Sequence, residues 1–183
     1  YFGPYPFRNE KYGHMEFNFN GICMEHQTMS SMSSWGRPVI SHELAHQWFG
    51  NAVTLAAWRD IWLHEGFACY SEWLWSEQAG HAPTAHRAAH FHSALAAKPQ
   101  DLLLADPGPD LMFDDRVYKR GALALFALHS AVGDDAFFGL LQAWLDRYRG
   151  RNATTADFLA LATAESGVDV SALLDPWLNQ LRL

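Results

Sequence analysis

The stretch SHELAHQWFGN, residues 41–51, holds the residues whose types and spacing point most directly to chemistry. Within it, His42 and His46 stand four positions apart and Glu43 follows the first of them. On a helix, positions i and i+4 share one face about one turn apart, so two imidazoles can bind one ion at Zn–N distances of about 2.0–2.1 Å. Glu43 then lies off that face, where it can hold a water. The alternative is an ordinary helix with two surface histidines.

A third candidate ligand makes the metal interpretation stronger. Glu65, in WLHEGFACYSEW, is separated from His46 by eighteen residues. Three protein ligands with a fourth position for water are typical of catalytic zinc. Glu72, seven residues and two turns beyond Glu65, is a candidate acceptor for the outer N–H of a ligand histidine, the alternative being a solvated acid. The sequence therefore predicts one Zn²⁺ per chain.

The bulk composition limits the kind of protein that carries this site. The chain has 183 residues, of which 49% are hydrophobic and 18% charged, with a formal net charge of −7. These values indicate one globular domain and argue against a nucleic-acid partner, which needs a basic surface. No apolar run approaches the roughly 20 residues of a membrane helix. With only Cys23 and Cys69, no disulfide framework is indicated, and a cytoplasmic location is predicted.

The elements that must position the site are a small β portion followed by helices. Alternating side chains predict a strand over residues 14–20, a second strand is expected over 23–32, and a helix over 38–49 ends before Gly50. The further helices are expected from residue 60 or 64 towards 80, and over 117–132, 134–149, 154–165 and 168–181. The predicted fold is α+β and mainly α, one domain over 1–183, with a β and loop portion over 1–35 and a helical body with the zinc site over 36–183.

Two further motifs extend the pattern in a fixed order. GICMEH covers residues 21–26, and VYKRGA covers residues 117–122. Together with HELAHQWFGN and EGFA, they resemble the gluzincin zinc aminopeptidases, the group of aminopeptidase N and leukotriene hydrolase. That family has a Gly-x-Met-Glu-Asn strand at the first motif and Tyr-x-Lys-Gly at the second. The resemblance runs from residue 3 to about residue 121 and implies a thermolysin-like catalytic domain.

The resemblance also implies a role for each matching residue. The roles are zinc ligation by His42, His46 and Glu65, proton transfer by Glu43, oxyanion stabilisation by Tyr118, binding of the substrate's α-ammonium by Glu25, and a substrate-binding edge lined by Gly21, Cys23 and Met24. The chain departs from the family at three positions. His26 and His64 each stand where Asn is usual, and Arg120 replaces a Lys, which keeps the charge but not its geometry.

Other residues with chemical potential have simpler explanations. His86 and His90 repeat the i, i+4 spacing, but no glutamate or third ligand accompanies them, so a solvated helix face is predicted. Cys69 is one turn from Glu65 and is expected to be a buried thiol rather than a ligand. Asp60 either orients a ligand histidine or caps its own helix, and the cap is preferred.

Together these features predict a zinc aminopeptidase that removes the N-terminal residue of a peptide. One alternative is a zinc endopeptidase or a hydrolase of non-peptide substrates with the same centre. Another is a non-catalytic zinc-binding scaffold. Glu25 distinguishes the first, because an endopeptidase has no ammonium to bind. The resemblance further implies that a β-rich domain, missing here, precedes Tyr1 in the parent protein.

Overall fold

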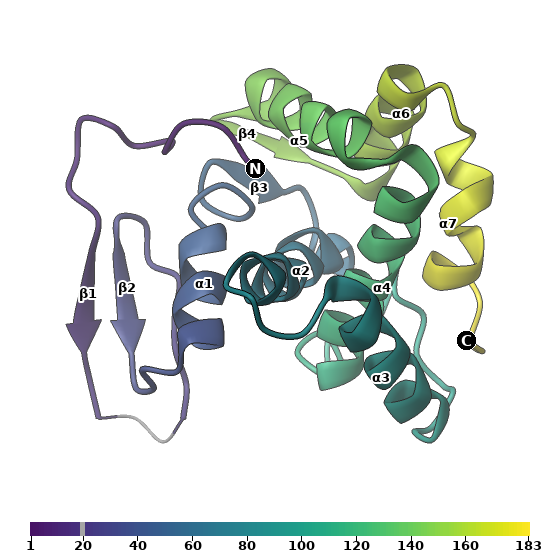
Figure 1. Ribbon diagram of the computed structural model, residues 1–183, viewed down its shortest axis with the longest axis horizontal. Helices are drawn as coiled ribbons and strands as arrows, with labels where there is room; N and C mark the ends of the chain where they lie inside the picture. Colours follow the sequence, from purple (N-terminus) through teal and green to yellow (C-terminus); the bar gives the residue numbers. More distant parts are fainter. Residues whose placement is uncertain (19–20) are drawn as a thin grey trace.

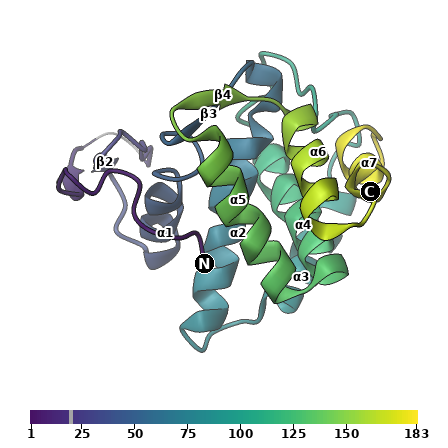
Figure 2. The same cartoon turned by 90° about the horizontal axis from the view of Figure 1, so that it is seen from above.

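A thin β margin lies on one side of helix α1 and a thick helical body lies on the other (Figures 1 and 2). The computed structural model describes residues 1–18 and 21–183. The elements are β1 (Gly13–Glu16), β2 (Met29–Met32), α1 (Arg37–Ala45), β3 (Val53–Leu55), the 3-10 helix η1 (Trp58–Asp60), α2 (Trp62–Gln78), α3 (Thr84–Ala96), α4 (Asp115–Val132), α5 (Asp134–Tyr148), β4 (Arg151–Ala153), α6 (Thr155–Ser166) and α7 (Val170–Leu178). The mainly helical α+β fold is thus as predicted.

The β margin is smaller than the sequence pattern suggests. β1 pairs in parallel with β2, from Gly13 opposite Met29 to Glu16 opposite Met32. The strand predicted over 14–20 ends at Glu16, and residues 19 and 20 lie outside the described part. The strand predicted over 23–32 is also wrong for its first half, because the chain turns at Thr28, where φ is 63°. Only the last four residues of that range form a strand.

Helix α1 ends earlier than predicted. It covers Arg37–Ala45 rather than 38–49, and the chain then continues through tighter turns. Trp48 N–H donates to the Ala45 carbonyl at 3.0 Å, a three-residue spacing that interrupts the α-helical ladder. The turns direct Phe49 into the core, where it is 1% exposed. Gly50 has φ 142° rather than the left-handed value expected of a helix cap.

Helix α2 is the centre of the helical body and packs mainly against α4 and α1. A hypothetical Cβ on Gly66 would lie 2.9 Å from Gly121 Cα, so the backbones of α2 and α4 touch at this pair of glycines. Any larger side chain at either position would force the helices apart. The crossing therefore fixes α4, which carries Tyr118, against α2, which carries Glu65.

The remaining helices form around this crossing largely as predicted. The capping box of Thr154 and Asp157 starts α6, while α7 ends at Leu178, three residues before the predicted end. Asp60 does not cap its own helix. Its carboxylate accepts from Thr155 N at 3.0 Å and Thr155 Oγ1 at 2.6 Å, so it supports the start of α6, 95 residues away. Within the described residues, we find no helix with the length and apolarity that a membrane crossing requires.

Candidate active site

Two histidines at the C-terminal end of α1 and one glutamate of α2 converge on one point. His42 Nε2 lies 3.3 Å and His46 Nε2 lies 3.5 Å from Glu65 Oε2. The three atoms that would bind a metal are all within 4.8 Å of one another. His46 and Glu65 are buried; His46 is the residue directly after α1, at its C-cap, and Glu65 stands in the first turn of α2. The structure therefore brings together the three residues that the sequence predicts as zinc ligands.

The outer ring nitrogens of both histidines are held by acceptors. His46 Nδ1 lies 3.0 Å from the Phe49 carbonyl oxygen, and His42 Nδ1 lies 2.8 Å from Glu72 Oε1. A carbonyl oxygen only accepts hydrogen bonds, so His46 carries its proton on Nδ1. Nε2 is then the nitrogen that points at Glu65, and it is the one that would bind a metal once its own proton is released. Glu72 is placed to fix His42 in the same way.

The pKa values of the site residues show that its buried carboxylate needs a positive charge beside it. Burial lowers the pKa of His42, but its hydrogen bonds to Glu65 and Glu72 outweigh burial and raise that pKa to about 10. Burial raises the pKa of Glu65, but the nearby His46 and His42 outweigh it, so the net pKa is well below its usual value. In the absence of a metal, positive charge on the imidazoles balances the buried carboxylate. A divalent cation between these three residues would serve the same purpose.

Glu43 faces the same space without a partner. Its side chain is buried, and its Oε2 atom makes no hydrogen bond in the described structure. Burial raises the pKa of Glu43 to about 7, although His46 and His42 partly oppose that rise. A buried polar atom without a partner is costly unless water or a ligand satisfies it. The residues thus fit a metal with a water or substrate oxygen beside Glu43.

Tyr118 completes the helical wall of the site. Its ring is stacked against the His42 ring, with centroids 6.0 Å apart and an angle of 17° between planes. Burial, reinforced by the charge of Glu65, raises the pKa of its hydroxyl, so Tyr118 stays a hydrogen-bond donor at neutral pH. Gly66 directly follows Glu65, and Gly121 lies three residues after Tyr118. The contact between the two glycines therefore holds Tyr118 close to Glu65.

The opposite wall of the site is the edge segment, residues 21–28. A cleft of about 970 Å³ joins this segment to the metal-binding residues. Its predicted site residues are Gly21, Cys23, Met24, Glu25, His42, Glu43, His46, Glu65 and Tyr118. Met24 forms an antiparallel bridge with Ser31 of β2, which aligns the segment along the cleft. Glu72 is the one predicted site residue outside this lining, since it lies behind His42.

The three departures from the family pattern have different structural consequences. His64 is buried, and burial lowers its pKa to about 4. Its Nε2 accepts from Leu55 N at 3.1 Å, so the neutral ring supports the β3 side of the cleft. His26 is exposed. Arg120 points away from the cleft.

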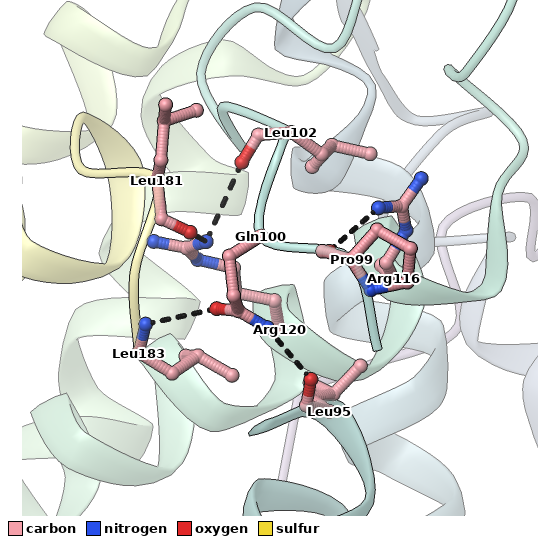
Figure 3. Close-up of a pocket in the computed structure, with 8 residues that line it drawn as sticks. All are labelled: Leu95, Pro99, Gln100, Leu102, Arg116, Arg120, Leu181 and Leu183. Carbon is pink, nitrogen blue, oxygen red and sulfur yellow. Dashed lines mark hydrogen bonds between the residues drawn. The ribbon is translucent and has the colours of Figure 1, made fainter. Parts of the chain in front are cut away.

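Arg120 binds the end of the chain instead. Its guanidinium donates to the Trp177 carbonyl at 2.7 Å. It also donates to the Leu181 carbonyl at 3.1 Å and, more weakly, to the Leu102 carbonyl (Figure 3). These carbonyls belong to the last turn of α7 and the residues after it, where a cation is favourable. The small depression drawn in Figure 3 is therefore a structural junction.

Sequence reasoning missed some residues of the site and its surroundings. The Phe49 carbonyl that holds His46 is a backbone group, so no residue pattern could reveal it. Trp58 and Phe113 line the cleft with rings 6.2 Å apart, although they are 55 positions apart in the chain. Cys69 is fully buried as predicted, with Sγ 3.3 Å from Lys119 Nζ.

Two helices that present two histidines and a glutamate, beside a buried carboxylate and a phenol, define the class of single-metal hydrolases with an HExxH helix. The comparisons with known proteins narrow this class. Residues 10–177 match the Peptidase family M1 domain. The chain belongs to peptidase family M1, the gluzincin aminopeptidase family that its motifs resemble.

Individual relatives agree with this assignment. An M1 zinc metallopeptidase from Deinococcus radiodurans has a TM-score of 0.92 and 38% identity, covering 100% of this chain and 41% of that chain. Probable aminopeptidase 2 of Sulfurisphaera tokodaii is 30% identical over 189 residues, which is 93% of this chain and 23% of that protein. Glutamyl aminopeptidase of Homo sapiens is 33% identical over 156 residues, 78% of this chain and 16% of that protein. The chain thus spans less than half the length of each.

Proposed function

We propose that the chain is the catalytic part of a zinc aminopeptidase, which hydrolyses the first peptide bond of a peptide with a free N-terminus. One observation carries the proposal: a single cleft is lined by the metal-binding residues, by Glu43 and Tyr118, and by Glu25. The names of its relatives point the same way. A mutant of the Deinococcus radiodurans relative is described as bound to a Tyr-Ser-Ala substrate.

His42, His46 and Glu65 would hold one zinc ion, with Glu72 orienting His42. When bound, zinc lowers the pKa of a water to about 7 and polarises the scissile carbonyl. Glu43 would take a proton from the attacking water and return it to the departing amine. Its buried, partnerless oxygen is in the right surroundings for this task, because a raised pKa brings a carboxylate close to the operating pH.

Tyr118 supplies the second stabilising contact. As the carbonyl becomes tetrahedral, its oxygen gains negative charge and needs a donor fixed in advance. The Tyr118 hydroxyl is such a donor, since its raised pKa keeps the proton on the phenol. The stacked contact with His42 limits how far the ring can turn.

Glu25 would select the N-terminal end of the peptide by binding its α-ammonium group. No lysine or arginine is among the described residues that line the cleft, so an incoming ammonium is the natural partner of this carboxylate. Backbone groups of residues 21–23 would pair with the substrate as an added strand, because the N–H and carbonyl of Met24 are already bonded to Ser31. An ammonium held at Glu25 in the same cleft as the metal-binding residues would present the first peptide bond to them, which limits cleavage to the N-terminal residue.

The proposed organisation follows the structure of the site. Residues 1–35 form the portion with the substrate edge, and 36–183 form the helical body with the metal-binding residues, within one catalytic domain. A β-rich N-terminal domain in the parent protein is part of the proposal, as the relatives are several times longer. Cys23 and Cys69 are free thiols, in keeping with a reducing, cytoplasmic compartment.

The test combines metal content with substrate preference, in this chain and in the parent protein. We expect about one zinc per chain, loss of activity on chelation, and hydrolysis of aminoacyl amides but not of their N-acetylated forms. Equal cleavage of the acetylated forms would overturn the aminopeptidase and leave a zinc hydrolase. A protein that binds no zinc would overturn both.

A further inference from the structure

The segment from Glu25 to Thr28 is held by two side-chain amides, which we name the amide tethers. Asn51 Nδ2 donates to the Glu25 carbonyl at 2.7 Å. Gln47 Oε1 accepts from Thr28 N at 2.8 Å, and Gln47 Nε2 donates to the His26 carbonyl at 3.3 Å. Three backbone groups of the segment therefore depend on two residues that lie 19 to 26 positions further along the chain.

Both tether residues are connected directly to the metal-binding residue His46. Gln47 follows His46 directly, and Asn51 N donates to the His46 carbonyl at 2.9 Å. The same turn supplies the Phe49 carbonyl that orients the His46 ring. One short loop thus holds a ligand histidine on one side and the backbone of Glu25 on the other.

Gln47 is fully buried, with 0% of its surface exposed. A buried amide is tolerated when its donor and acceptor are both satisfied, and it is costly when they are not. Here both ends of the Gln47 amide are satisfied by the edge segment. Moving that segment would leave buried polar groups without partners, so the contact restrains its position strongly.

We propose that Gln47 and Asn51 are positioning residues that fix Glu25 relative to the metal ligands, and so set the preference for a free N-terminus. This inference rests on the proposed function. The hydrogen bonds of the tethers go to backbone atoms of the segment. The Glu25 carboxylate remains available to the substrate, while the Glu25 backbone is held in a fixed position relative to the metal-binding residues.

The experiment uses the zinc-loaded chain with Glu43→Gln as the common background, so that the probes bind without being hydrolysed. The two probes are phenylalanine amide and N-acetylphenylalanine amide, with binding measured by calorimetry. Asn51→Ala removes the donor to Glu25 at a half-buried position. We expect its affinity for phenylalanine amide to fall about three- to tenfold, the loss of roughly one net hydrogen bond. Zinc content and the affinity for the acetylated probe should stay unchanged.

Two further variants complete the design. Gln47→Met keeps most of the side-chain volume but makes no hydrogen bonds, and should weaken phenylalanine amide binding at least as much. Gln142→Ala is the matched control, because it removes an amide contact to the Tyr1 carbonyl at 3.4 Å, away from the edge segment. It should bind both probes as the Glu43→Gln background does.

The possible outcomes separate the positioning proposal from the aminopeptidase proposal. If Asn51→Ala binds phenylalanine amide normally, or loses affinity for both probes equally, the positioning role is overturned and the aminopeptidase proposal stands. If the Glu43→Gln background does not prefer the free amine, the aminopeptidase proposal itself fails. Should Gln47→Met not fold, Asn51→Ala alone carries the decision.

Discussion

The two walls of the cleft are held in different ways. The helical wall, from α1, α2 and α4, is part of the buried core, and the backbones of α2 and α4 touch at Gly66 and Gly121. The edge segment, residues 21–28, is half-exposed or exposed throughout. It is joined to the rest by hydrogen bonds: the bridge at Met24, the amide tethers, two bonds from Ser33 to Ile22 and Cys23, and one from Gly13 N to the Thr28 carbonyl.

This difference matches the tasks proposed for the two walls. Proton transfer and charge stabilisation require atoms placed to within a fraction of an ångström, which close packing provides. Recognition of a chain end tolerates more adjustment, and hydrogen bonds to backbone are sufficient for it. Changes in the helical wall should therefore act on turnover or folding. Changes in the edge segment should act on substrate affinity.

The largest expected effect is in the helical wall, at Glu43. Glu43→Gln keeps the size of the side chain but removes the proton acceptor, so kcat should fall about 10²- to 10⁴-fold. Zinc content should be unchanged, since Glu43 is not among the three converging ligands. Steady-state kinetics and metal analysis measure both quantities.

His46→Ala is the matched variant for this prediction. It removes one of the three converging ligands, and it should lose the metal together with the activity. A Glu43→Gln protein that came out of purification without zinc would make Glu43 a ligand and contradict the proposed roles.

Tyr118→Phe should have the next largest effect. It removes one hydroxyl from the same wall and keeps the ring that stacks on His42. One lost oxyanion donor corresponds to about 10²- to 10³-fold in kcat, and KM should change little because the donor acts in the transition state. A large rise in KM at constant kcat would instead show that Tyr118 binds the ground state.

The contact between the glycines tests whether packing holds the helical wall. In Gly121→Ala, the new Cβ would lie 2.8 Å from Gly66 Cα, so the helices must separate. Overpacking of this kind lowers the free energy of unfolding by about 1–3 kcal/mol, and kcat should fall with it as Tyr118 moves. Thermal or urea unfolding gives the first quantity.

Gly139→Ala is the control for this substitution. Gly139 lies in α5 and has no neighbouring atom within 4 Å of the added Cβ. The same change there should raise stability by up to about 1 kcal/mol, because alanine is the better helix former. If both variants behaved alike, the contact between α2 and α4 would have no special weight.

The two walls also differ in how well the sequence predicted them. Helix periodicity and the HExxH spacing predicted the metal-binding residues, because i, i+4 geometry on a helix is local. The edge segment was predicted poorly. Residues 23–28 looked like a continuous strand, yet the chain turns at Thr28, a β-branched residue that rarely adopts positive φ.

Long-range hydrogen bonds explain most of the other differences. No residue pattern indicated that Asp60 would bind Thr155, or that Arg120 would bind the carbonyls near α7. Each joins positions more than 50 residues apart. The motif match at the edge is also inexact, as two residues separate Gly21 from Met24 where the family pattern has one. As a result, Cys23 precedes Met24 in the cleft as the additional residue.

The smallest expected effect lies in the edge segment, at Thr28. Its φ of 63° is unfavourable for a β-branched side chain, and such strain costs about 1–3 kcal/mol. Thr28→Asn relieves part of it, because asparagine tolerates this conformation, and keeps the N–H that binds Gln47. Stability should rise by about 0.5–1 kcal/mol, with kcat and KM unchanged. Thr28→Val retains the branched Cβ and should bring no gain. A Thr28→Asn protein that was less stable, or bound free-amine substrates more weakly, would mean that the threonine side chain itself shapes the edge segment. The amide tethers would then not be sufficient to hold it.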